Sequence, residues 1–364
     1  MKNTLKHAKS QRMAGGWVTA QSTKPGATSL VSCLVLFIGV VLLPLGCSEP
    51  VQSSSATESS LADVSVNTLV PEAIRIVREG LADKDPQIRV NAIEVVAATK
   101  QVPMMPKVQR LLRDPLVPVR FLALLAVGDL QYALAQEEAK QLLNDPDENV
   151  RIAAAYALVR LGHPEYMQFF RNAIASEDQT VRANAALLLG KSGDRSTLTG
   201  KALWWTLQRK DSNDGVRFQA AEALAMLGDE RIYPKLWAML ISAYADDRVV
   251  GIRAMGALRT ERAKNALITM LDDGILEVRL AAAEQLGKFK DPIGEPEVLD
   301  VFTKNLTADM DRLDQQRVRV LTTLAIGQIG SKPLVKYLPR LLKDESRFVQ
   351  LAAAKAVFQC AMRK

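Results

Sequence analysis

Aliphatic and small residues recur along the chain at helical spacing. In residues 145–162, DPDENVRIAAAYALVRLG, aliphatic Val150, small Ala154 and aliphatic Leu158 stand at minus one, plus three and plus seven from Arg151. At 100° per residue these offsets lie along one face of a helix, whereas strand residues alternate with a period of two. The stretch therefore predicts a helix with a buried aliphatic stripe and a small residue where a neighbouring helix approaches.

Eight further segments repeat this pattern, and all nine align on the position of Arg151. The aligned positions are Arg89, Arg120, Arg151, Arg182, Arg217, Gly251, Arg279, Arg319 and Gln350. The spacing between them, in chain order 31, 31, 31, 35, 34, 28, 40 and 31, leaves room in each unit for two short helices and two turns. The longest step contains residues 291–297, DPIGEPE, which we expect to form a longer loop. Arginine is missing from the series at Gly251 and at Gln350.

An aspartate stands a few residues ahead of each copy. These residues are Asp85, Asp114, Asp145, Asp178, Asp214, Asp247, Asp273, Asp314 and Asp344. Because aspartate accepts hydrogen bonds from the free amides of a first helical turn, we interpret them as helix starts. The first outer helix is predicted to begin near Pro71. The aligned arginines lie beside the buried stripe and near these acids, which favours bridges between adjacent repeats over a row of anion-binding sites.

The segment DENVRIAAAYALVRLG resembles the short HEAT repeats of phycobilisome-lyase-like proteins, whose pattern is DxxVRxxAAxALGxLG. The resemblance extends over residues 70–364. It implies an all-α fold, an α-solenoid superhelix of about nine HEAT-type helix pairs, over residues 66–364. Because solenoids of this kind serve many functions, the resemblance implies an architecture rather than an activity.

The N-terminal region has the pattern of an export signal. Residues 1–29 form a basic n-region in which Met13 is an alternative start, and residues 30–46, LVSCLVLFIGVVLLPLG, are apolar. The ending LPLGC resembles the lipobox of bacterial lipoproteins, which implies lipidation of Cys47, although Pro44 departs from the usual leucine. The alternative is an uncleaved signal anchor, because such a run is just long enough to span a bilayer.

Both alternatives predict an exported, membrane-anchored protein on the periplasmic or cell-surface side. The serine-rich residues 47–65 then form a flexible tether before the repeats. Most of the formal net charge of +7 comes from residues 1–46, which contain five basic residues and no acidic one. The remainder has 47 − 5 = 42 basic against 40 acidic residues, or +2. A nearly neutral solenoid lacks the basic stripe that nucleic acids require, so we expect no nucleic-acid partner.

Candidate chemistry is sparse. His7 and His163 are the two histidines, which excludes a His/Cys metal cluster and the several His–Glu pairs of the HEAT-repeat deoxyhypusine hydroxylases. We therefore predict no metal, no cofactor and no catalytic residues. The tryptophan pair Trp204 and Trp205 on a predicted outer helix points one ring away from the core, which is a possible contact surface; packing between repeats is the simpler interpretation.

The sequence favours a non-catalytic scaffold that binds a protein or peptide partner on its inner-helix face. The stripe opposite the core falls at offsets of plus two, plus five and plus nine from the aligned position. There Leu125, Tyr156 and Leu187 form an apolar row edged by Arg160 and Lys191, suited to an extended peptide or to an amphipathic helix with acidic flanks. Packing of this row between repeats is the alternative interpretation. The alternative function is a bilin-lyase-like or other HEAT-repeat enzyme.

Overall fold

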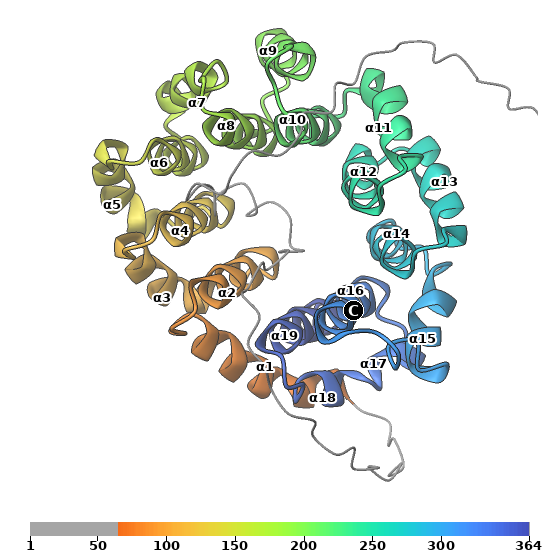
Figure 1. The fold of residues 1–364 in the computed structure, drawn as a ribbon. Helices are drawn as coiled ribbons and strands as arrows, with labels where there is room; N and C mark the ends of the chain where they lie inside the picture. Colours follow the sequence, from red (N-terminus) through yellow and green to blue (C-terminus); the bar gives the residue numbers. More distant parts are fainter. Residues whose placement is uncertain (1–64, 364) are drawn as a thin grey trace, which may run out of the picture.

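The computed structural model describes residues 65–363, and within this range every regular element is a helix. Longer helices line the inside of a closed ring, and shorter helices form its outer wall (Figure 1). The inner helices are α2 (Pro86–Ala98), α4 (Val117–Asp129), α6 (Glu148–Arg160), α8 (Gln179–Ser192), α10 (Asp214–Met226), α12 (Ala245–Leu258), α14 (Leu276–Lys288), α16 (Arg312–Ile329) and α19 (Arg347–Ala361). The predicted all-α solenoid of about nine helix pairs is confirmed.

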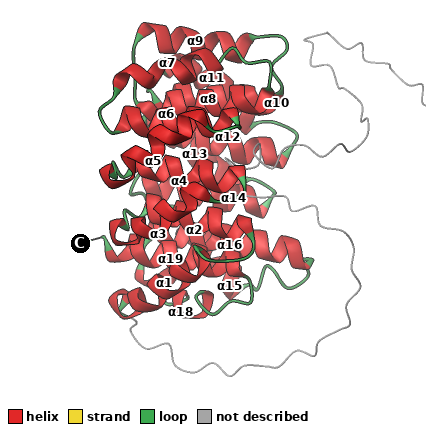
Figure 2. Cartoon of the chain, turned by 90° about the vertical axis from the view of Figure 1, so that its left-hand side faces the viewer, coloured by secondary structure: helices red, strands yellow, loops and turns green. Residues whose placement is uncertain are grey.

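The outer wall is built from shorter and less regular helices. They are α1 (Val66–Gly80), α3 (Met105–Arg110), α5 (Gln136–Gln141), α7 (Met167–Ala173), α9 (Thr197–Gln208), α11 (Tyr233–Leu240), α13 (Glu261–Thr269), α15 (Glu295–Thr303), α17 (Lys332–Val335) and α18 (Leu338–Leu341). Seen from the side, inner and outer helices run across the wall roughly parallel to one another (Figure 2). Single 3-10 turns begin or end several outer helices: η1 (Val102–Met104), η2 (Leu111–Arg113), η3 (Ala133–Ala135), η4 (Leu142–Asn144), η5 (Pro164–Tyr166), η6 (Glu230–Ile232) and η7 (Met270–Asp272).

Inter-repeat ion pairs join several successive repeats. Arg120 lies 2.9 Å from Asp145 through two separate nitrogen–oxygen contacts, and it donates to the carbonyl of Asp114, six residues before it, at 2.9 Å. The same inter-repeat contact joins Arg89 to Asp114, Arg248 to Asp273 and Arg319 to Asp344. The predicted bridging role is therefore confirmed at Arg89, Arg120, Arg182 and Arg319, whereas Arg151 donates to carbonyls of its own repeat.

The alignment of the sixth copy on Gly251 is wrong, because Arg248 makes the contacts of an aligned arginine. Arg248 Nη1 donates to the carbonyl of Ser242, six residues before it, at 2.9 Å, and Arg248 Nε lies 2.8 Å from Asp273. With Arg248 in the series, the steps from Arg217 and to Arg279 both become equal to the regular step of the first four copies. Gly251 then occupies the small position at plus three, where an added methyl would lie 2.7 Å from Met239 Cβ.

Most of the predicted helix starts are displaced. Only Asp85 and Asp178 cap their helices as N-cap residues through their side chains. In four other repeats the aspartate lies two residues ahead of the N-cap, accepts the amide two residues on, and receives the arginine of the preceding repeat; these are Asp114, Asp145, Asp273 and Asp344. At this position each carboxylate accepts the amide of the N-cap residue instead of an amide of the first turn, so the predicted capping role is corrected there.

Two further boundary predictions are wrong. Helix α1 begins at Val66, and Pro71 lies inside it on the exposed side. The additional length of the longest step lies after α15 rather than in residues 291–297. The stretch from the end of α15 to the next aligned arginine, Arg319, is more than twice as long as the stretch from the end of η7 to Arg279. This difference accounts for the whole excess of the longest step over the regular one.

The first and last repeats pack against each other and close the ring, a feature that was not predicted. Helix α1 contacts α19 more extensively than it contacts its own partner α2. An added methyl on Gly80 would lie 3.1 Å from Leu351 Cδ2, so the leucine side chain packs directly against the glycine. Lys355 Nζ lies 3.1 Å from Glu94 across this seam, and Arg347 lies 3.1 Å from Asp83. Because both ends bury apolar surface on each other, neither end has an exposed terminal face.

Candidate functional site: the central cavity

The inner helices enclose a central cavity of about 900 Å³. One side chain from each inner helix, five residues after the aligned position, points toward the ring centre. This row is Glu94, Leu125, Tyr156, Leu187, Glu222, Arg253, Glu284, Leu324 and Lys355, and all of its members except Tyr156 line the cavity. Because every inner helix runs in the same direction, one sequence offset becomes a continuous belt around the cavity.

The cavity has an apolar half and a charged half. Helices α4 and α8 contribute Leu125 and Leu187, with Leu122 beside them. Helices α10, α12 and α14 contribute Glu222, Arg253 and Glu284 in succession. A ligand in the cavity therefore meets aliphatic side chains on one side and charges of both signs on the other.

Neighbouring cations set the protonation of Glu284. Burial raises the pKa of its carboxyl, but the positive charges of Lys288, Arg253 and Lys355 outweigh burial and lower the pKa below the ordinary value. The contact with Lys288 Nζ is 3.1 Å. Glu284 is therefore ionised and internally neutralised.

The pKa of Glu222 shifts in the opposite direction to that of Glu284. Burial among the inner helices is the largest influence and raises the pKa of its carboxyl, although Arg253 lowers it. Its hydrogen bond within the described chain comes from Gln219 Nε2 at 3.2 Å. Burial outweighs the cations here because none of them makes a direct ion pair with the carboxylate in residues 65–363.

The residues predicted to bind a partner divide between the cavity and the core. Leu125, Leu187 and Lys191 line the cavity, as expected of an inner-helix face. Tyr156 does not, since it is 1% exposed and its hydroxyl donates to Asp129 at 2.5 Å. The prediction of an exposed row is therefore wrong at Tyr156, where the alternative of packing between repeats holds.

The two flanking bases differ from the prediction as well. Lys191 pairs with Asp129 at 2.9 Å, so its charge is already neutralised. Arg160 lies at the end of α6 and borders a shallower hollow with Gly162 and Ser192 instead of the central cavity. The role of all five residues in binding a partner stays a prediction.

Arg253 was missed because of the misaligned sixth copy. Glu222 and Glu284 fall at plus five in either alignment, but the partner-binding prediction was not extended to their repeats. With Gly251 aligned, the offset of plus five falls on Gly256 and skips Arg253. A glycine at plus eight is the signal that identifies the correct alignment; it occurs in five repeats, as Gly128, Gly190, Gly256, Gly287 and Gly327. Once Arg248 is aligned, the sequence alone places Glu222, Arg253 and Glu284 in one row.

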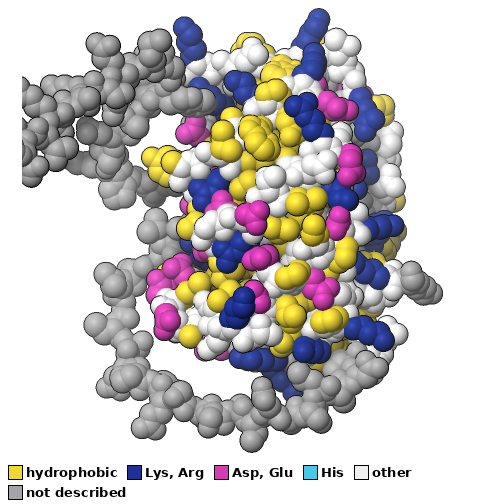
Figure 3. Space-filling view, turned by 90° about the vertical axis from the view of Figure 1, so that its right-hand side faces the viewer, with side chains coloured by type: hydrophobic (Ala, Val, Ile, Leu, Met, Phe, Trp, Pro, Cys, Tyr) yellow, Lys and Arg dark blue, Asp and Glu magenta, His cyan; other side chains and the backbone are white. Residues whose placement is uncertain are grey.

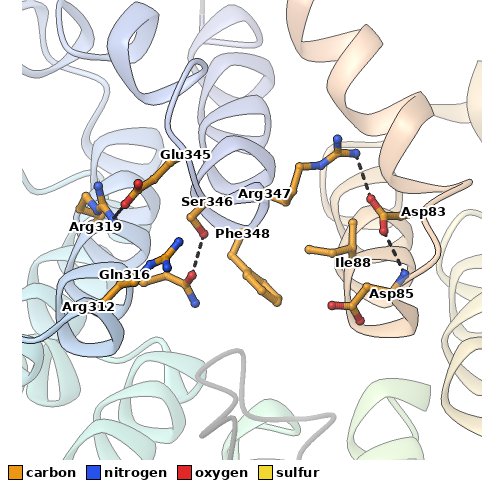
Figure 4. A pocket seen from close by; sticks show the side chains of 10 residues that line it. All are labelled: Asp83, Asp85, Ile88, Arg312, Gln316, Arg319, Glu345, Ser346, Arg347 and Phe348. Atoms are coloured by element: carbon orange, nitrogen blue, oxygen red, sulfur yellow. Dashed lines mark hydrogen bonds and ion pairs between the residues drawn. The ribbon is translucent and has the colours of Figure 1, made fainter. Parts of the chain in front are cut away.

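A second pocket of about 320 Å³ lies at the seam between the first and last repeats. Its polar side chains point toward one another rather than into open space (Figure 4). Arg347 pairs with Asp83 at 3.1 Å, Arg319 with Glu345 at 3.2 Å, and Ser346 donates to Gln316. Of these contacts, the pair between Arg347 and Asp83 joins the first repeat to the last.

The tryptophan pair lies on the outer wall. Trp204 is half-buried, and its Nε1 donates to Asp229 at 2.8 Å, which fixes α9 on the next repeat. Trp205 points outward, is 48% exposed and lies under the guanidinium of Arg209. The outer face drawn in Figure 3 shows Lys and Arg side chains gathered along its right-hand edge and lower margin, with acidic and apolar side chains mixed over the rest.

Within residues 65–363, no cluster of three or more His, Cys, Asp or Glu side chains could hold a metal ion. None of the helices in that range has the length and apolarity needed to cross a bilayer. The predicted signal or anchor (residues 30–46) and the lipidation site Cys47 lie outside the described residues.

Comparison with protein families matches HEAT repeats over residues 106–189, 136–203, 168–250 and 242–321. Among curated proteins, none matches the chain. Several solved structures show a distant likeness. The complex of CpcE and CpcF of phycocyanin lyase from Nostoc sp. PCC7120 is 16% identical, with a TM-score of 0.39, over 69% of this chain and 93% of that one.

Human deoxyhypusine hydroxylase in complex with glycerol is 17% identical, with a TM-score of 0.36, over 73% of this chain and 99% of that one. The karyopherin Kap121p, bound to the extreme C-terminus of the protein phosphatase Cdc14p, is 16% identical, with a TM-score of 0.35, over 78% of this chain and 37% of that one. At such scores these three likenesses carry no argument about function.

Proposed function

Because the chain belongs to the HEAT-repeat family, in which stacked helix pairs present one continuous inner surface, we propose that it is a non-catalytic scaffold that binds a protein or peptide segment in its central cavity. The observation that carries this proposal is the belt of inner-helix side chains around the cavity. Its combination of aliphatic and charged groups suits a peptide better than a purely apolar ligand, because a peptide offers partners for both halves.

The volume of the cavity limits the bound part of the partner. About 900 Å³ is in the range of small-ligand pockets. The cavity therefore takes a short segment, or the side chains along one face of a helix, rather than a folded domain. The outer wall and the ring ends remain available for the rest of the partner.

A photo-cross-linking experiment tests the site. The full chain is prepared with benzoylphenylalanine in place of Leu122, which is half-buried in the cavity wall, or of Leu134, which is 75% exposed on the outer wall. Membranes containing either variant are irradiated, and the cross-linked peptides are identified by mass spectrometry. We expect a defined adduct at position 122 that is lost when Ala257→Trp fills the cavity.

The position of the adduct decides the outcome. An adduct at position 134 alone, or one at position 122 that survives Ala257→Trp, places the partner outside the cavity and contradicts the proposal. Circular dichroism of each variant shows that the ring is folded, so that the loss of an adduct reports on the cavity and not on unfolding.

The competing function is an enzyme of the bilin-lyase-like or another HEAT-repeat class. A tetrapyrrole lyase would need to hold its chromophore, so incubation with a bilin followed by gel filtration and absorption spectroscopy separates the two functions. The scaffold proposal expects no bilin to co-elute with the protein.

We further propose that the ring is exported and membrane-anchored, either by lipid on Cys47 or by residues 30–46 as a signal anchor. The basic n-region, the apolar run and the lipobox-like LPLGC support this proposal. Metabolic labelling with an alkyne fatty acid is expected to mark the unmodified chain and not the Cys47→Ser variant. Equal labelling of the two would contradict lipidation, and membrane fractionation of Cys47→Ser then tests the anchor.

A further inference from the structure

Three of the four acidic side chains in the cavity wall are neutralised by bases of the same wall. Asp129 pairs with Lys191 at 2.9 Å, and Glu284 pairs with Lys288 at 3.1 Å. Glu94 pairs with Lys355 at 3.1 Å across the seam. The charged groups left over are Glu222, Arg253 and Arg259.

Arg253 is a guanidinium without a structural partner in the described part of the chain. It forms no ion pair within residues 65–363, although it feels the charges of Glu222 and Glu284 on the neighbouring helices. It lies within α12, five residues before the last residue Leu258, so it does not serve as a cation at the helix end. Every aligned arginine, in contrast, makes contacts that hold the fold together.

Of the three cations around Glu222, Arg253 is the one that forms no ion pair with an acid of the cavity wall in the described part of the chain. The same helix provides Gln219, while α12, α14 and α8 provide Arg253, Lys288 and Lys191. These cations lower the pKa of Glu222, yet burial outweighs them and shifts the carboxyl toward its neutral form. A shift toward the neutral form weakens the repulsion that Glu222 exerts on an anion.

Further positive charge stands at one end of the cavity. Arg259, which is one of the charges left over, lies just beyond the C-terminal end of α12. Lys191 and Lys288, which are paired with Asp129 and Glu284, lie at the ends of α8 and α14. Because the inner helices run in the same direction, these ends share one mouth of the ring. An anionic segment entering there approaches Arg253 along a surface of matching charge.

We propose that the cavity selects acidic amphipathic peptide segments: a carboxylate of the segment pairs with Arg253, while its apolar side chains pack on Leu125 and Leu187. This inference rests on the proposed peptide-binding function and names the class of partner. The ion pair supplies selectivity because the guanidinium of Arg253 is partly desolvated. A carboxylate compensates for the lost hydration better than a neutral amide does, and a cation would be repelled.

Three short synthetic peptides test the selection. They carry the same leucines on one helical face, with Glu, Gln or Lys on the other, and their affinities are measured by isothermal titration calorimetry at neutral pH. The Glu peptide is expected to bind about tenfold more tightly than the Gln peptide, the effect of one charge-assisted contact. Arg253→Gln is expected to remove that difference, while the control Arg110→Gln on the exposed side of α3 keeps it.

The remaining outcomes distinguish a failure of the proposed selectivity from a failure of the proposed peptide binding. Equal binding of the three peptides, or a preference for the Lys peptide, overturns the selection but leaves the cavity as a peptide site. Failure of all three peptides to bind overturns the selection and the cavity site together.

Discussion

An aligned arginine acts through two kinds of contact, and the repeats differ in how many of them they keep. Arg120 has both, since it donates to carbonyls of its own repeat and makes a bidentate contact with Asp145 of the next. Arg151 has the first kind only, at 2.9 Å to the carbonyl of Asp145 and 3.0 Å to that of Pro146. In the repeat that follows Arg151, Ser176 stands where the repeat that follows Arg120 has the bridging Asp145. Comparing Arg120 with Arg151 therefore measures the contribution of the inter-repeat ion pair, because both residues make the same bonds to carbonyls.

We expect Arg120→Ala to lower the free energy of unfolding by about 3 kcal/mol, because it leaves the buried carboxylate of Asp145 without its cation. The side chain of Asp145 is only 5% exposed. Arg151→Ala removes hydrogen bonds to carbonyls alone and is expected to cost about 1 kcal/mol. Urea denaturation followed by circular dichroism measures both values. Equal losses would show that the ion pair adds nothing to the carbonyl bonds.

At the scale of the element, inner helices approach each other through small residues. An added methyl on Gly190 of α8 would lie 2.7 Å from Ala223 Cα and 2.9 Å from Ala223 Cβ of α10. Since backbone atoms of a packed helix cannot move aside, glycine is required by the space at this position and not by the conformation of the chain. Gly200, in the outer helix α9, would have no heavy atom within 4 Å of an added methyl and serves as the contrast.

Gly190→Ala is therefore expected to destabilise the ring by roughly 1 to 3 kcal/mol through overpacking, although alanine is the better helix former. Gly200→Ala should stabilise it by up to about 1 kcal/mol, because only the backbone-entropy effect remains. Thermal unfolding of the two variants beside the unmodified chain gives the signs directly. A stabilised Gly190→Ala would mean that α8 and α10 are less closely packed than the structure has them.

At the scale of the whole molecule, closure of the ring changes the neighbours of the end repeats. An open solenoid leaves the outer faces of its first and last repeats in water, whereas here α1 covers α19 and Lys355 reaches Glu94. The side chain of Lys355 is 11% exposed and that of Glu94 is 31% exposed. The two residues of this contact come from opposite ends of the repeat array. The end repeats are thus stabilised by each other.

Reversing one charge of this pair is expected to weaken closure. Lys355→Glu places two carboxylates together at the seam and should lower the free energy of unfolding by roughly 2 to 4 kcal/mol, and adding Glu94→Lys should restore much of it. Lys304→Glu, which reverses a largely exposed pair with Asp300 on the outer wall, is the control and should cost less than about 1 kcal/mol. Melting temperature and small-angle X-ray scattering follow stability and ring dimensions. No rescue by the double variant would mean that the pair does not hold the seam.

The sequence by itself determined the helical repeat, the buried aliphatic stripe and the bridging role of the arginines. Each of these follows from residues within one repeat or its neighbour, and nine copies average out the ambiguity of a single one. The same information was sufficient to place Arg248 in the series, since the regular spacing and the glycine at plus eight both indicate it. The sixth copy was aligned on Gly251 because its aliphatic residues matched there, although the steps on either side then departed from the regular spacing.

Only the tertiary structure decided which part of the inner face is accessible and that the ring closes. Tyr156 and Leu187 occupy the same offset, yet Tyr156 reaches Asp129 of the preceding helix while Leu187 lines the cavity. Closure depends on the small rotation between successive repeats, added over the whole ring. The sequence of a single repeat does not show this total rotation. The position of the charged side chains opposite Leu125 follows from the same addition, because α12 and α14 face α4 only once the ring has turned back on itself.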